Sequence, residues 1–199
     1  KDAYGANLLF LIDESGSTSG SCINTERRLM IIIAEALKGT RINTAIIGFS
    51  ADGSGSRVTE RVYKEFNDPH DKGKLETINS NNRFYENRDG TSMEYCLQHF
   101  SKTNKRNKAI IVLSDGMPNH ADYRGSEATT KTRQSIRRVR DYGIDLHGVG
   151  IGIRSKKEYR DMYDNKDVVV VSLNELEKTL IGLVNNIATK IEERDNFYS

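Results

Sequence analysis

The stretch Leu8-Leu-Phe-Leu-Ile-Asp-Glu-Ser-Gly-Ser17 decides the fold of this chain. It opens with an unbroken apolar run, Leu8 to Ile12, which ends abruptly at an acidic residue. A short apolar run bounded by turn residues is typical of a strand that is buried on both faces, as in a parallel sheet. We therefore expect a central strand here, with a polar loop directly after it.

Three oxygen-bearing side chains follow this strand at alternate positions: Asp13, Ser15 and Ser17. Gly16 lets the loop turn without a side-chain clash, so the three side chains can point to one side. One carboxylate and two hydroxyls are hard oxygen ligands, which suit Mg²⁺, Mn²⁺ or Ca²⁺ and not a thiophilic metal. The same residue types are common in turns after strands, so a metal site needs further ligands from elsewhere in the chain.

The size and charge of the chain fit one ordinary domain. Its 199 residues can bury a substantial core, and 30 basic residues nearly balance 28 acidic ones. The basic clusters 102–108 and 137–140 are expected to be solvated surface and not a nucleic-acid interface. No segment of the sequence approaches the ~20 apolar residues of a membrane span. Because the chain starts at Lys1 without a leader, we expect a single domain, residues 1–199, cut from a longer protein.

Strand and helix patterns alternate along the rest of the chain. The expected strands are 42–49, 58–66, 109–113, 144–151 and 168–171, and the expected helices are 24–38, 72–78, 91–100, 126–142, a short one capped by Ser155 and Glu158, and a long one capped by Asn174. A turn at Ser54-Gly55-Ser56 should pair the strand 58–66 antiparallel with 42–49. The fold class is therefore α/β: a doubly wound, mostly parallel six-stranded sheet with one antiparallel edge strand and helices on both faces.

A second acidic residue follows another strand of this sheet. In a sheet of this kind, ligands bind beyond the carboxyl ends of the strands. Asp115 comes directly after the strand 109–113, as Asp13 comes after the first strand, so the two carboxylates are expected to meet. Asp115 on its own also fits an Asp-Gly turn.

A third loop, Asn87-Arg-Asp-Gly-Thr-Ser92, lies directly before a helix and offers Asp89 and Thr91. Thr91 and Glu94 also have capping-box spacing, so helix capping alone would account for the threonine. The Asp-x-Ser-x-Ser loop, the Gly-Thr junction and the strand-terminal Ser-Asp-Gly occur in this order on an α/β chain. This conjunction is far less expected by chance than any one of its members.

The three segments resemble the von Willebrand factor type A (vWA) domain family, and the likeness covers essentially the whole chain. The metal-ion-dependent adhesion site of that family implies Asp13, Ser15 and Ser17, then Thr91, then Asp115 as ligands of Mg²⁺ or Mn²⁺. Hydroxyl ligands are neutral, so the ion keeps positive charge and attracts an acidic side chain. The resemblance therefore implies a protein-binding module whose partner carries an exposed Asp or Glu, and no catalysis by the domain alone.

A narrower likeness is to the vWA domains of the cobalt-chelatase subunit CobT and of nitric-oxide-reductase activation proteins. It is carried by 113–118, 145–152, 168–171, the Leu-rich terminal helix and Asn-Arg-Asp-Gly at 87–90. That group implies an alternative function with an AAA+ ATPase partner, in metal insertion for cobalamin biosynthesis or in metalloenzyme activation. We expect a cytoplasmic location, whereas an adhesion module would be extracellular. Its second loop often offers Asp-Gly without the Thr, so Asp89 could replace or supplement Thr91 as a ligand.

A hydrolase is the competing class of function. Ser15, Asp115 and either His120 or His147 could be written as a catalytic triad. The sequence lacks the Gly-x-Ser-x-Gly elbow that exposes such a nucleophile. We expect His147 to be packed within a strand, His120 to line the rim of the metal loops, and the domain to be no enzyme on its own.

Two smaller patterns have structural explanations. The spacing of Gly148-Val-Gly-Ile-Gly152 is not that of a dinucleotide fingerprint, and close backbone packing at the end of a strand explains it better. The chain has no P-loop. Cys22 and Cys96 do not have zinc-site spacing. We expect free thiols, although two cysteines could also form a disulfide.

Overall fold

The computed structural model describes residues 4–52, 57–80 and 86–197 of the chain. Its strands are β1 (Ala6–Asp13), β2 (Ile42–Ala51), β3 (Val58–Lys64), β4 (Asn107–Ser114), β5 (Asp145–Ile151) and β6 (Val168–Val171), in the sheet order β3-β2-β1-β4-β5-β6. Every neighbouring pair is parallel except β2 and β3, which are antiparallel. The predicted fold class is confirmed. The turn expected at 54–56 lies outside the described residues.

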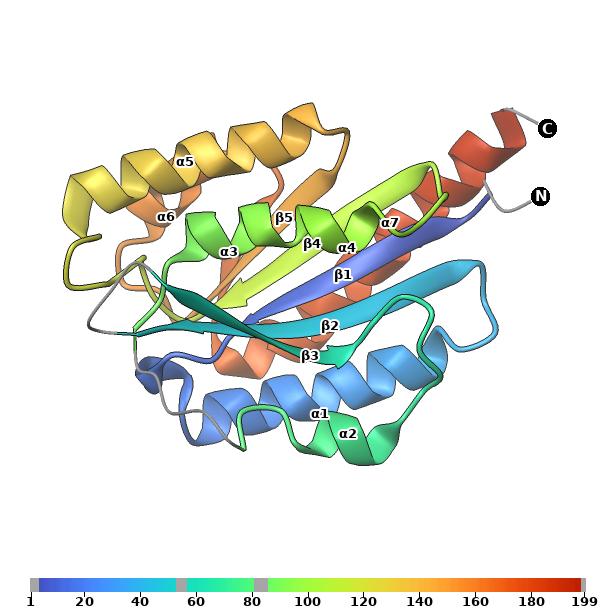
Figure 1. Ribbon diagram of the computed structural model, residues 1–199, viewed down its shortest axis with the longest axis horizontal. Helices are drawn as coiled ribbons and strands as arrows, with labels where there is room; N and C mark the ends of the chain where they lie inside the picture. The colour runs from blue at the N-terminus through green and yellow to red at the C-terminus, as the bar shows by residue number, and fades with distance from the viewer. Residues whose placement is uncertain (1–3, 53–56, 81–85, 198–199) are drawn as a thin grey trace.

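Helices cover both faces of the sheet (Figure 1). They are α1 (Ser21–Ala36), α2 (Lys72–Glu76), α3 (Asp89–Tyr95), α4 (Leu97–Phe100), α5 (Gly125–Asp141), α6 (Lys156–Met162) and α7 (Leu176–Phe197). One apolar cluster joins α1, α2 and α7 to the first face, and a second joins α3, α4, α5 and α6 to the other. No helix of the described part is long and apolar enough to cross a membrane.

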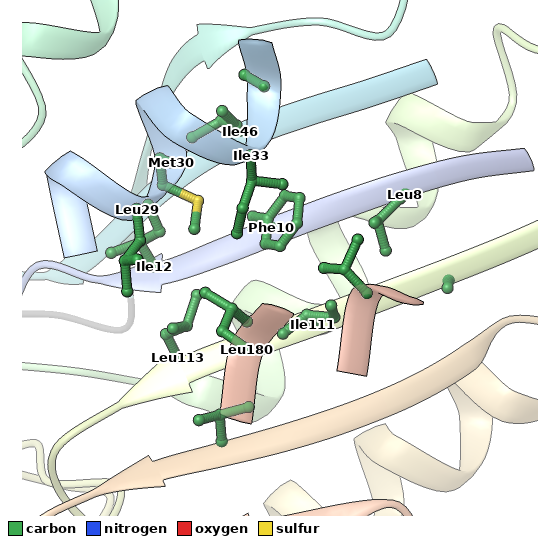
Figure 2. Close-up of a cluster of buried hydrophobic side chains, with 14 of the residues drawn as sticks. Leu8, Phe10, Ile12, Leu29, Met30, Ile33, Ile46, Ile111, Leu113 and Leu180 are labelled. Carbon is green, nitrogen blue, oxygen red and sulfur yellow. The ribbon is translucent and has the colours of Figure 1, made fainter. Parts of the chain in front are cut away.

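The central strand β1 is buried along its whole length, as its apolar run predicted. Successive side chains of a strand point to opposite faces. Leu8, Phe10 and Ile12 therefore belong to the first cluster, and Leu9 and Leu11 to the second. Figure 2 shows the first set lying against side chains of α1 and α7. Full burial of each such side chain stabilises the fold by about 1.5–3 kcal/mol.

The helix expected at 91–100 begins earlier and is divided. It starts at Asp89, and a break at Cys96 separates α3 from α4. Thr91 is thus inside α3, with Arg88 at the N-cap position, so the capping box with Glu94 does not form. The helix begins two residues before the threonine, so the N–H groups of Met93 and Glu94, which Thr91 would have capped, bond to carbonyls within the helix.

Two other cap predictions are corrected in the same way. Ser155 precedes α6, but its side chain makes no cap hydrogen bond. The terminal helix is preceded by a 3₁₀ turn, Leu173–Glu175, capped by a Ser172–Glu175 capping box. Asn174 lies within this turn and caps nothing. The 3₁₀ turn starts one residue before Asn174, the residue that looked like the best N-cap.

The glycines of β5 are required by packing, as predicted. A Cβ added to Gly148 would lie 2.5 Å from the ring of Tyr163, and one at Gly150 would lie 2.8 Å from the ring of Tyr159. Cys22 packs with the first apolar cluster and Cys96 belongs to the second. The sheet lies between them, so the two thiols are free, as expected.

Candidate metal centre

The carboxyl ends of β1 and β4 lie side by side because the two strands are parallel neighbours in register. Figure 1 shows both arrowheads at the edge of the sheet where α1 and α3 begin. Asp13, the last residue of β1, is fully buried there. Its Oδ2 accepts hydrogen bonds from Ser114 Oγ at 2.9 Å and Asn87 Nδ2 at 3.1 Å, and its Oδ1 accepts one from the Ser15 N–H at 2.8 Å. Three separate segments of the chain therefore fix this one carboxylate.

The two serines continue the cluster from Asp13 to Asp115. Ser15 Oγ and Ser17 Oγ are 3.1 Å apart, and Ser17 Oγ donates to Asp115 Oδ1 at 2.7 Å. A single 3₁₀ turn, Gly16–Thr18, brings the serines together. The structure thus places Asp13, Ser15, Ser17 and Asp115 in one cluster of oxygen atoms, as the sequence predicted.

The second loop contributes Asp89 to this cluster and not Thr91. Asp89 is 1 % exposed, its Oδ1 has no hydrogen-bond partner among the described residues, and the charges of Asp13 and Asp115 act on it. Residues two apart on a helix lie about 200° apart around its axis. Thr91 accordingly faces another way and lines a groove between α3 and α5 with Glu94. The structure does not bring Thr91 to the other expected ligands.

The carboxyls of the cluster are difficult to ionise in the absence of a cation. Burial raises the pKa of Asp13 to about 6, the charge of Asp115 adds to this, and hydrogen bonds from Ser15 and Ser114 oppose it. Burial, followed by the charge of Asp13, raises the pKa of Asp89 well above its usual range. Burial also raises the pKa of Asp115. In the described part of the chain, no Lys, Arg or His forms an ion pair with any of the three.

A divalent cation fits this set of donors. It would supply the positive charge that the three carboxyls lack, and the oxygen donors suit a hard ion. Within the described residues, no three Asp, Glu, His or Cys side chains converge as a metal cage by themselves. The hydroxyls of Ser15 and Ser17 are therefore needed to complete the donor set. Mg²⁺ typically keeps several waters, so a partly open site of this kind suits it.

Three residues that hold the cluster in place were not singled out from the sequence. Asn87 and Ser114 donate to Asp13, and Thr18 Oγ1 donates to the Ser15 carbonyl at 2.8 Å, which closes the turn. Asn87 lies two residues before Asp89, and Ser114 directly precedes Asp115, so their positions beside expected ligands could have indicated a supporting role. Their bonds to a residue of another strand were visible only in the structure.

Glu14, between Asp13 and Ser15, is the centre of a second buried network. Its Oε2 accepts from Arg61 Nη1 at 2.5 Å, and its Oε1 accepts from Tyr63 Oη at 2.5 Å and from the Asn79 N–H at 2.8 Å. A Cβ at Gly48 would overlap this carboxylate. Because the partners come from β3 and the segment after α2, no local pattern indicated this role. The network ties the metal loop to the β2–β3 side of the sheet.

The histidines do not assemble a catalytic triad. His120 is buried rather than placed on the rim: its Nδ1 contacts Asp122, and its Nε2 lies 2.6 Å from the Asp52 carbonyl oxygen. His147 is buried in β5, as predicted, with Nδ1 3.8 Å from Asp167. Among the described residues, neither ring has a hydrogen bond to Ser15.

Comparisons with known proteins agree with this fold. The model of the von Willebrand factor type A domain family matches residues 7–186. A search of curated proteins gives no significant match.

Three solved structures show the same fold. The pilus adhesin SpaC from Lactobacillus rhamnosus GG, in an open conformation, superposes with a TM-score of 0.74 at 15% identity, covering 96% of this chain and 31% of the adhesin. Proximal thread matrix protein 1 from the mussel byssus, with a zinc-occupied MIDAS motif, gives 0.66 at 18% identity, covering 96% and 47%. Manganese-loaded TRAP protein from Plasmodium vivax gives 0.64 at 16% identity, covering 89% and 72%. This chain therefore spans about a third of the adhesin and about half of the thread protein.

Proposed function

Because the chain belongs to the von Willebrand factor type A domain family, we propose that it is a divalent-metal-dependent protein-binding module. Its ion site would engage an acidic side chain of a partner. The observation that carries this proposal is the hydrogen-bonded cluster of Asp13, Ser15, Ser17 and Asp115 at the ends of β1 and β4. Its acidic side chains have raised pKa values and no cationic partner among the described residues.

Each residue of the cluster has a distinct part in this proposal. Ser15 and Ser17 would hold the ion through their hydroxyls, and Asp115 and Asp89 would act directly or through water. Asp13 already accepts three hydrogen bonds, of about four that a carboxylate can accept, so it has little capacity left for a direct contact. The bound ion would supply a Lewis-acidic positive charge, and the neutral hydroxyls would leave it attractive to a partner carboxylate.

The structural neighbours support an adhesion role. SpaC is described as a pilus adhesin, and the thread protein and TRAP carry zinc and manganese respectively. We extend to this chain the binding of a divalent ion, with Mg²⁺ or Mn²⁺ preferred over zinc because the donors are hard oxygens. As an adhesion module, the protein would act outside the cell.

The alternative is a CobT-type subunit that works with an AAA+ ATPase in the cytoplasm. One observation favours it: Asp89, and not Thr91, lies by the cluster, which corresponds to the Asp-Gly second loop of that group. None of the comparisons supports a role in metal insertion. Co-purification with an AAA+ ATPase would distinguish this alternative from an adhesion module.

Isothermal titration of the metal-free domain with Mg²⁺ and Mn²⁺ tests the proposal. Acetate in the buffer stands in for the carboxylate of a partner. We expect saturable binding that is lost in Asp13→Ala. The matched control is Asp145→Ala, at the opposite end of the sheet, which removes an exposed carboxylate that accepts a hydrogen bond from Arg194. Normal ion binding by Asp13→Ala, or no binding by the wild type even with acetate, would overturn the proposal.

A further inference from the structure

Glu26, in α1, is a buried acid for which the described part of the chain offers no hydrogen-bond partner. Its side chain is fully buried, and neither carboxyl oxygen has a hydrogen-bond partner among the described residues. Glu14, the other fully buried glutamate, is bound by Arg61 and Tyr63. A buried polar group without a partner is costly. No hydrogen bond from the described residues offsets this cost.

The helix places Glu26 behind the metal loop. Ile23, Glu26, Met30 and Ile33 are all buried, and their spacing of three and four residues puts them on the face of α1 that packs on the sheet. Figure 2 shows Leu29 and Met30 near Ile12 of β1. The helix begins at the carboxyl edge of the sheet (Figure 1), so Glu26 lies about one turn closer to that edge than Met30. It is therefore near the level of Asp13.

Electrostatic interactions place Glu26 in the same region. Burial raises its pKa well above the usual range, and the charges of Asp13, Asp115 and Glu14 raise it further, in that order. Cys22 lies one turn earlier on the same helix. Burial raises the pKa of its thiol, and the charges of Glu26, Asp115 and Asp13 add to this. Two side chains of α1 thus lie within the field of the same carboxyl groups.

We propose that Glu26 is a determinant of cation affinity, a further carboxylate behind the Asp13–Ser15–Ser17 loop that acts on the bound ion through space or through a water molecule. This inference rests on the proposed function, because it needs an ion at the cluster. The donor set contains two neutral hydroxyls, and a bound cation favours the ionised form of Glu26, which then adds negative charge without using a coordination position. The ion in turn supplies the partner that Glu26 lacks. Removal of a group that supports a metal ligand from outside typically weakens metal binding by about 10- to 100-fold.

The test compares four variants of the metal-free domain with the wild type. Glu26→Gln keeps the size of the side chain and removes its charge, and Glu26→Met is an apolar replacement of similar length. Glu35→Gln removes the same charge from an exposed position on the same helix, and Asp13→Ala removes the proposed site. Titration calorimetry gives the Kd for Mg²⁺ and Mn²⁺, and thermal unfolding with and without each ion gives the ion-dependent rise in Tm.

We expect Glu26→Gln to bind both ions about 10- to 100-fold more weakly, with a smaller ion-dependent rise in Tm. Its metal-free Tm should stay close to that of the wild type, because one buried polar group without a partner replaces another, whereas the metal-free Tm of Glu26→Met should equal or exceed it. Glu35→Gln should bind like the wild type.

If Asp13→Ala loses binding while Glu26→Gln binds normally, the inference is overturned and the proposed function stands. A lower metal-free Tm, or failure to fold, in both Glu26 variants would show a role in the fold and would also overturn it. Normal binding by Asp13→Ala would instead contradict the proposed function.

Discussion

Ser17 donates a 2.7 Å hydrogen bond to Asp115, a residue 98 positions further along the chain. This bond joins the loop after β1 to the loop after β4, at the edge where both strands end. It connects the first and third segments of the proposed ion site directly, through protein atoms alone. The donors are therefore largely pre-arranged, which lowers the cost of ordering them when an ion binds.

Asp115→Asn tests how much the third loop contributes to ion binding. The amide keeps the size of the side chain but loses the negative charge that faces the site. We expect Mg²⁺ affinity to fall by about 10- to 100-fold, with little change in stability because the residue is only half-buried. Titration calorimetry measures the affinity. Ser19→Ala, in the exposed part of the first loop, is the control and should bind like the wild type.

The choice between Asp89 and Thr91 can be settled by a pair of variants. Asp89→Asn removes a buried charge near Asp13, so ion affinity should fall at least tenfold, or about 1.4 kcal/mol. Thr91→Ala changes a residue of the α3–α5 groove, and its ion affinity should stay within about twofold. The same calorimetric titration measures the ion affinity of both variants. A large loss of affinity in Thr91→Ala alone would show that the second loop rearranges around the ion.

The stability of the metal-free domain should fall as the pH rises through Asp13's titration range. The folded-state pKa of Asp13 is raised to about 6, against about 3.9 in an unfolded chain. Between these values the folded state binds more protons than the unfolded state, so its stability decreases by up to about 3 kcal/mol. Urea unfolding with a chelator at pH 4.5 and pH 7 should show this loss, and Asp13→Asn should show less of it.

Ion binding should have the opposite dependence on pH. A cation favours the ionised carboxylates, so its affinity should weaken as the pH falls below about 6. Titrations with Mg²⁺ at pH 5 and pH 7 measure this difference. An affinity that does not change over this range would mean that Asp13 is already ionised in the metal-free protein.

Gly48→Ala should destabilise the fold through Glu14. The new Cβ would overlap the Glu14 carboxylate, which is held by Arg61 and Tyr63. Overpacking of this kind typically costs about 1–3 kcal/mol, and displacement of a paired buried charge adds to it. Urea unfolding measures the loss. Gly182→Ala is the matched control: no atom of the described residues lies within 4 Å of the added Cβ. At this exposed position on α7, the substitution should raise the free energy of unfolding by up to about 1 kcal/mol.

The strands and the ligand loops could be predicted because their signals are local. An apolar run followed by Asp or Ser-Asp marks both the end of a strand and the start of a ligand loop. The start of α3 could not be predicted, since Thr91 and Glu94 have the same spacing whether they cap a helix or lie inside it.

The surroundings of Glu14 and Glu26 could not be predicted from the sequence either. The partners of Glu14 come from β3 and from the segment after α2, which only the folded chain brings together. A glutamate within a helix such as α1 ordinarily faces water. The burial of Glu26 therefore became visible only when the face of α1 that packs on the sheet was known.

The parallel pairing of β1 with β4 has a kinetic consequence. The ligand loops are remote in sequence, so no ion site exists until these two strands have paired. An ion that recognises only the completed edge cannot guide earlier steps of folding. It should leave the refolding rate nearly unchanged and slow unfolding. Stopped-flow experiments should then give the same refolding rate with and without Mg²⁺, and a lower unfolding rate with Mg²⁺. Slower unfolding would lengthen the lifetime of the folded module wherever the cation is abundant.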